Sequence, residues 1–178
     1  MSAAGTEPIS GTYISTSLGG PLLVIARETL SDRDWRVAVL PEGRPNISSK
    51  FDELERFLVV GGAPATIVPT GDMGYGYAAT AEDSSSLRNL VQRTADDFVI
   101  SSGRANLALA VSDAEVHVVV GDEDSLLRFV GGNAEQFAES VGFWIEAQRR
   151  YEIDHGVILE LVRHYEPNLL DSMRFLAQ

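Results

Sequence analysis

The chain has 178 residues, of which 44% are hydrophobic and 22% are charged, and these proportions are those of a folded domain rather than a disordered chain. It has no cysteine, which excludes disulfides and thiolate metal sites. Fourteen basic and 26 acidic residues give a net charge of −12. That charge repels phosphate, so it disfavours binding to nucleic acid or to an anionic membrane surface, and it attracts a basic protein. Solubility alone is the competing explanation of the charge.

The N-terminal segment and the apolar runs give an expectation about location. Residues 1–8 lack both the basic stretch and the apolar core of a secretion signal. The longest apolar runs, such as residues 21–26, fall far short of the roughly 20 residues that cross a bilayer. We therefore expect a cytoplasmic protein with a flexible N-terminus over residues 1–10 and one domain over residues 11–178.

The first half of the chain contains short apolar runs rich in β-branched and aromatic residues, separated by glycine and proline. This pattern predicts β-strands. The predicted strands cover residues 12–16, 22–26, 35–40, 57–60, 66–69 and 75–79. Residues 84–97 differ, because Leu87, Leu90 and Val91 fall at i, i+3 and i+4 behind serines that can cap, and this spacing predicts a helix.

A second series of short runs follows. Val116, Val118 and Val120 alternate with Glu115 and His117, which is the period of a strand with two different faces. A tight turn is expected at residues 112–114 and a loop at 121–125. The series predicts an antiparallel meander whose strands cover residues 98–101, 106–111, 115–120 and 126–130.

The last part of the chain is predicted to be helical. Asn133 is a favoured N-cap residue, and Gln136 stands three positions later, as in a capping box. A long helix is expected from there because an apolar stripe follows at helical spacing: Ala134, Phe137, Ala138, Val141, Trp144, Ile145 and Tyr151. Two further helices are expected over residues 154–165 and 168–176. The whole pattern predicts an α+β fold, with a twisted, largely antiparallel sheet, helices packed on one face and long C-terminal helices.

The sequence offers no pattern typical of an active site. The three histidines, His117, His155 and His164, do not have the four-residue spacing of a helical metal pair. No serine lies in a G-x-S-x-G motif, and the glycine-rich residues 71–76 lack the Lys-Ser/Thr of a phosphate-binding loop. We therefore predict no catalytic residues, no metal ligands and no cofactor. A triad assembled from distant residues, as in a hydrolytic enzyme, stays open as an alternative.

Binding to another protein is the function that this elimination favours. The predicted acidic loop at Asp122, Glu123 and Asp124 displays negative charge on a rigid sheet, and such a loop steers a basic partner. Asp96 and Asp97 are the other candidate partner-binding residues. A charged hairpin tip also keeps a sheet edge from aggregating, and this simpler explanation fits the three loop residues equally well.

Residues 97–171 resemble the SUKH superfamily, nearest its fourth immunity-protein branch. The resemblance lies in a strand that runs into a helix beginning Glu-Gln-Phe, over Arg128-Phe129-Val130, Gly131-Gly132-Asn133 and Ala134-Glu135-Gln136-Phe137. It extends to the later segments Arg149-Arg150-Tyr151, Tyr165-Glu166-Pro167 and Leu170-Asp171. The branch usually has an Asn-Ser-Ser type of sequence where this chain has Gly131-Gly132-Asn133, and the first 95 or so residues show no motif of the family.

The resemblance implies an immunity protein that binds and neutralises a cognate bacterial toxin. Toxins countered by this superfamily are often nucleases or deaminases, which tend to be basic, and the family has no catalytic residues to carry over. A chaperone or adaptor that holds another protein is the main alternative, because small acidic α+β dimers have the same composition.

Overall fold

A computed structural model of the chain describes residues 8–15, 21–41, 50–70, 78–94, 97–102, 107–112, 116–131 and 156–177, and between the last two ranges residues 135, 138, 139, 141–143 and 146. Its strands are β1 (Gly11–Ser15), β2 (Pro21–Ile25), β3 (Arg36–Pro41), β4 (Ala65–Pro69), β5 (Ala79–Ala81), β6 (Phe98–Ser102), β7 (Leu107–Val111) and β8 (Val116–Gly121). Its helices are α1 (Arg27–Arg33), α2 (Lys50–Gly61), α3 (Ser84–Arg93), α4 (Glu123–Val130) and α6 (Gly156–His164), with the 3-10 turns η1 (Glu166–Asn168) and η2 (Asp171–Ala177).

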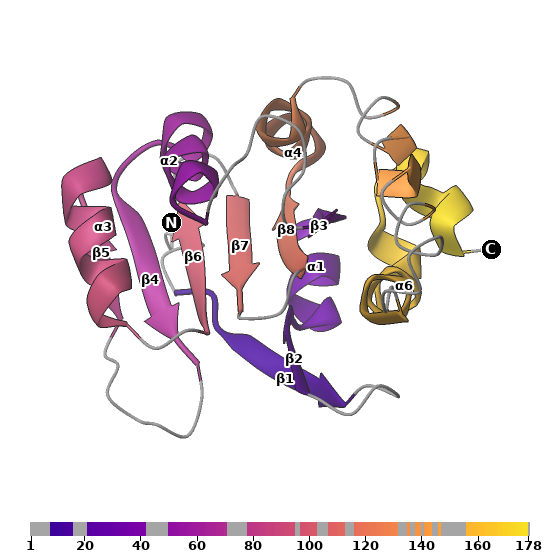
Figure 1. Cartoon of the computed structure of the whole chain (residues 1–178), viewed down its shortest axis with the longest axis horizontal. Helices are drawn as coiled ribbons and strands as arrows, with labels where there is room; N and C mark the ends of the chain where they lie inside the picture. Colours follow the sequence, from indigo (N-terminus) through magenta and orange to yellow (C-terminus); the bar gives the residue numbers. More distant parts are fainter. Residues whose placement is uncertain are drawn as a thin grey trace.

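Six of these strands form one antiparallel sheet in the order β3-β8-β7-β6-β4-β5, and β1 and β2 form a separate hairpin (Figure 1). Each of the strands β6, β7 and β8 pairs with its neighbour in the chain, so the predicted meander is confirmed there. The α+β class and the largely antiparallel sheet are confirmed as well.

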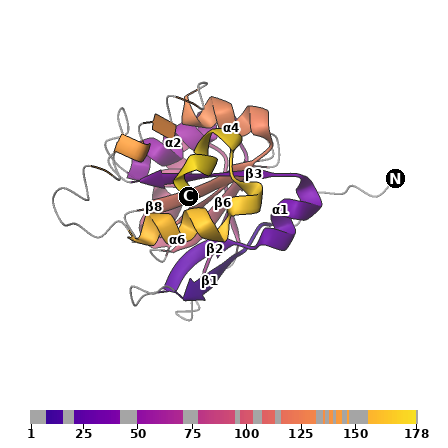
Figure 2. The ribbon, with the colours of Figure 1, turned by 90° about the vertical axis from the view of Figure 1, so that its right-hand side faces the viewer.

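The sheet is covered on both faces. Ser102 of β6 lies on the face that α2 covers, because a Cβ atom on Gly61 of that helix would come within 2.9 Å of the Ser102 Cβ. Val99 points to the opposite face, where a Cβ on Gly11 of β1 would meet the Val99 Cγ2 at 3.0 Å. Figure 2 shows α2 and α4 on one side of the sheet and the hairpin on the other. Both glycines thus allow a backbone to approach the sheet more closely than a side chain would permit.

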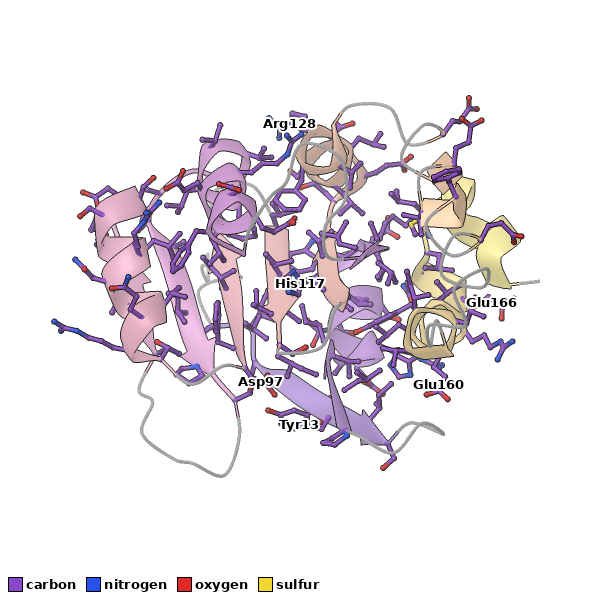
Figure 3. All side chains as sticks on the ribbon, in the orientation of Figure 1. Tyr13, Asp97, His117, Arg128, Glu160 and Glu166 are labelled. Atoms are coloured by element: carbon purple, nitrogen blue, oxygen red, sulfur yellow. The ribbon has the colours of Figure 1, made fainter. Side chains whose placement is uncertain are left out.

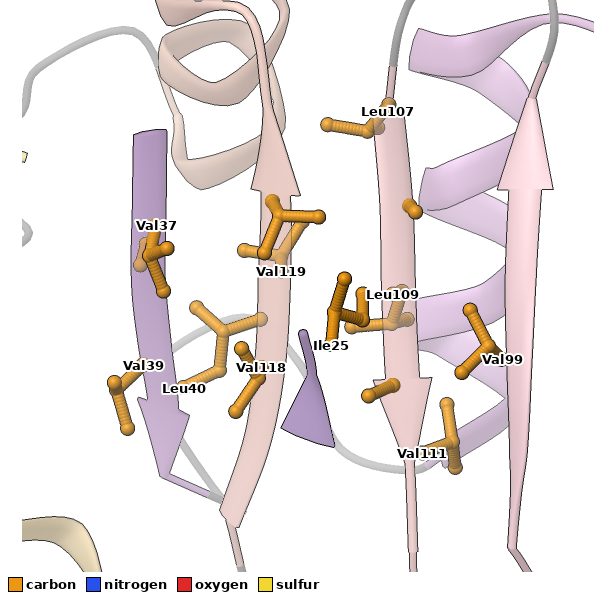
Figure 4. Close-up of a cluster of buried hydrophobic side chains, with 14 of the residues drawn as sticks. Ile25, Val37, Val39, Leu40, Val99, Leu107, Leu109, Val111, Val118 and Val119 are labelled. Atoms are coloured by element: carbon orange, nitrogen blue, oxygen red, sulfur yellow. The ribbon is translucent and has the colours of Figure 1, made fainter. Parts of the chain in front are cut away.

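The core lies between these layers. Strand β7 is buried along its whole length, which agrees with layers on both of its faces. Ile25 of β2 is fully buried and lies near valine and leucine side chains of β7 and β8 (Figure 4). Ile9 belongs to the same core, although it falls within the segment predicted to be flexible. The hairpin is therefore part of the hydrophobic core and not an appendage.

The C-terminal segment covers the β3 edge of the sheet. The Leu170 N–H donates a hydrogen bond of 3.0 Å to the Val37 carbonyl, and Leu169 forms an isolated parallel bridge with Val37. Helix α6 also packs against β3. The predicted helix over residues 154–165 is thus found as α6, and the predicted third helix over residues 168–176 is found as the 3-10 helices η1 and η2.

Two predicted strands are wrong. Residues 57–60 belong to α2, where the buried residues Leu54, Phe57 and Leu58 recur at helical spacing while Val59 is 83% exposed. Residues 126–130 belong to α4, which buries Leu126 and Phe129 three positions apart. In both cases a short apolar run at the end of a helix has the same pattern as a short buried strand. Helix α1 was missed, because Leu30 is its one buried residue.

The long helix predicted from Asn133 is described at seven positions, and all of them are helical. These are residues 135, 138, 139, 141–143 and 146. Its predicted N-cap lies outside the described residues, as do the glycine-rich segment at residues 71–76 and part of the predicted strand at 75–79. Strand β5 begins at Ala79, the last residue of that predicted strand.

Candidate functional site

Two of the three histidines, His117 and His164, lie in the described part of the chain. His117 is buried in β8, and His164 is partly buried at the end of α6. Burial, and then the nearby Arg27 guanidinium, lower the pKa of His164, while Glu28 opposes this effect. Among the residues that the structure describes, no three His, Cys, Asp or Glu side chains gather in a way that could hold a metal ion. His155 lies outside those residues.

Ser102 is a buried serine of β6, and its hydroxyl has a structural partner. Its Oγ donates to the Gly61 carbonyl and lies 3.1 Å from that of Gly62, where α2 ends. Ser86 completes a capping box with Asp83 at the start of α3, and this arrangement lowers the pKa of Asp83. Ser102 thus binds the end of α2, and Ser86 has the cap role that the sequence predicts for the serines before Leu87.

Tyr165 is a fully buried polar side chain. The sequence analysis did not predict its burial. Its hydroxyl donates 2.9 Å to the Ile25 carbonyl and accepts 2.8 Å from the Ile25 N–H, so it satisfies both backbone groups at the end of β2. Burial raises the pKa of this phenol. The contact ties the C-terminal segment to the hairpin.

The predicted acidic loop is the start of a helix. Asp122 is the N-cap of α4, and its carboxylate accepts from the Ser125 N–H at 2.9 Å and from the Ser125 hydroxyl at 2.9 Å. Glu123 and Asp124 occupy the first turn and are exposed. Carboxylates in this position stabilise a helix through its dipole. These three residues thus have a structural role, which leaves their predicted role in partner binding untested.

The second predicted group lies elsewhere. Asp97 directly precedes β6, and its carboxylate accepts a 2.8 Å hydrogen bond from the Tyr13 hydroxyl of the hairpin. Asp96 lies outside the described residues. Figure 3 shows Asp97 and Tyr13 close together, well away from Arg128 on α4.

Strand directions separate the two predicted groups. Strands β6 and β8 both pair antiparallel with β7, so they run the same way. Asp97 precedes the first residue of β6, whereas Asp122 follows the last residue of β8. The two groups therefore lie at opposite ends of the strands, roughly 17 Å apart along a five-residue strand. Asp97 and Asp122 do not form one surface patch.

The pairing of β3 with β8 places other carboxylates at the same end of the sheet as Asp122. Arg36 pairs with Gly121, so the exposed residues Asp32 and Asp34 at the end of α1 lie at the same end of the sheet as the start of α4. We call this region the acidic end, and it consists of Asp32, Asp34, Asp122, Glu123 and Asp124. The sequence analysis missed its first two members, because more than 80 residues separate them from the others.

Arg33, a basic residue next to Asp32 and Asp34, contacts an aromatic ring. The Arg33 guanidinium carbon lies 4.9 Å from the centre of the Trp35 ring, in a cation–π contact, and the arginine is partly buried. Arg36 is also partly buried. Asp32, Asp34, Glu123 and Asp124 are exposed, whereas these two cations and Asp122 are partly buried.

Neither a membrane-spanning helix nor a known relative helps to define the site. Within the described part of the chain, no helix combines the length and the apolar character that a membrane crossing requires. Comparison with protein families, with characterised proteins and with solved structures finds no match to this chain.

Proposed function

We propose that this protein binds a basic protein partner, and that it does so as an immunity-type inhibitor of a toxin. The single observation that carries the proposal is the acidic end, where two segments distant in the sequence place their carboxylates at one end of adjacent strands. The net charge of −12 extends the same sign over the molecule.

The physical role of such a surface is to steer and orient the partner. A negative surface raises the rate of encounter with a positive one, and like-charge contacts exclude wrong partners. Carboxylates also resemble phosphate in charge, so they can occupy the basic cleft of a nuclease or deaminase. Four of the five residues of the acidic end, all except Asp122, are exposed. We therefore expect the acidic end to act on the association rate, and we expect this effect to weaken with salt.

The immunity role itself rests on the resemblance of residues 97–171 to the SUKH superfamily. Arg128, Phe129 and Val130, where the resemblance implies a strand, are instead the end of helix α4. The resemblance is therefore one of sequence there, and Glu135 in the segment that follows is helical as the resemblance implies. Binding of a toxin by such a protein needs no catalytic group.

The test is a binding and protection experiment with the product of the gene adjacent to this one. The purified adjacent protein is titrated with the wild type at 50 and 300 mM NaCl, and cells that express it are scored for growth with and without this chain. We expect a 1:1 complex, slower association at the higher salt concentration, and restored growth. Absence of both binding and protection would reject the proposal, and a stable homodimer that holds unfolded proteins instead would indicate the chaperone class.

A pair of charge-matched variants tests the acidic end itself. Asp34→Asn with Glu123→Gln removes one carboxylate from each segment, and Asn suits the left-handed conformation of residue 34, where φ is 52°. Glu82→Gln with Glu160→Gln lowers the charge equally, from −12 to −10, at other places on the molecule. We expect slower association of the first variant only. Equal slowing of both would show that net charge, and not the acidic end, steers the partner.

A further inference from the structure

We draw no further inference here: the strongest candidate, the exposed apolar surface patch around Val59 on the outward side of helix α2, carries nothing because no feature in the described part of the chain shows what covers it.

Discussion

A single hydroxyl group at Tyr165 satisfies two backbone groups of a residue 140 positions away in the chain. Buried backbone groups that lose their partner cost more free energy than the hydrogen bond itself contributes, because water cannot replace the partner. Tyr165→Phe removes only the oxygen atom and leaves the Ile25 N–H and carbonyl without it. We expect a loss of about 1–3 kcal/mol in the free energy of unfolding, measured by urea denaturation at pH 7.

The same residue gives a pH dependence with a definite sign. Burial raises the pKa of the Tyr165 phenol above its ordinary value of 10.0, so the unfolded chain releases this proton at lower pH than the folded one. The folded state then binds more protons, and stability falls as pH rises above 10. The decline should be smaller in Tyr165→Phe. An equally steep decline in both proteins would show that other groups cause it.

Asp122 allows a second test at this scale, because it separates a structural role from a charge. Asp122→Ala removes the cap of α4 and should cost about 1 kcal/mol of unfolding free energy. Asp122→Asn keeps an oxygen acceptor for the Ser125 N–H and should cost much less, although both variants lose the same charge. Urea midpoints of the two variants decide this, and equal destabilisation would mean that the charge matters more than the cap.

At the scale of elements, close approach decides how α2 sits on the sheet. Gly61→Ala would stabilise an ordinary helix by about 1 kcal/mol. Here the new Cβ would stand 2.9 Å from the Ser102 Cβ, so we expect net destabilisation of about 1–3 kcal/mol. The penalty should shrink in a Ser102→Gly background, where that atom is absent. A double-mutant cycle measures the coupling, and a zero coupling energy would contradict the contact.

The elements also show how much of the fold the sequence predicts. The strands of the meander were predicted because each short run is bounded by turn residues and contains β-branched residues. The runs at residues 57–60 and 126–130 satisfy the same criteria, yet they are helical. Each is the end of a helix, and its apolar residues continue a stripe that begins earlier in that helix. The sequence does mark both helix starts, because each first turn contains two acidic residues. Periodicity over four or five residues cannot separate the two cases.

At the scale of the whole molecule, charge sets the response to salt. A net charge of −12 on 178 residues repels itself, and this repulsion is stronger in the compact folded state than in the expanded chain. Raising NaCl from 10 to 300 mM should therefore raise the urea midpoint, because salt screens the repulsion. A midpoint that falls with salt would show that attractive ion pairs, such as Arg88 with Glu55, outweigh it.

The same scale explains why the candidate site could be predicted only in part. The sequence identified Asp122, Glu123 and Asp124 as an exposed acidic group, but it could not tell that Asp97 lies at the opposite end of the strands. That difference depends on strand order, which is set by pairings between distant segments. The position of residues 32–34 and 122–124 at the same end of the sheet depends on the β3–β8 pairing in the same way. Composition predicted a charged surface, and topology determined where it lies.

The clasp between Tyr165 and the end of β2 has a consequence for synthesis in the cell. A ribosome adds roughly 5–20 residues per second, so the 140 residues between the two partners take about 7–28 s to make. Throughout that time the Ile25 N–H and carbonyl lack the Tyr165 hydroxyl as a hydrogen-bond partner. The β3 edge likewise lacks the C-terminal residues that cover it. Productive folding must therefore finish late, after the C-terminal residues have left the exit tunnel, and a stalled ribosome would hold an incomplete and aggregation-prone chain.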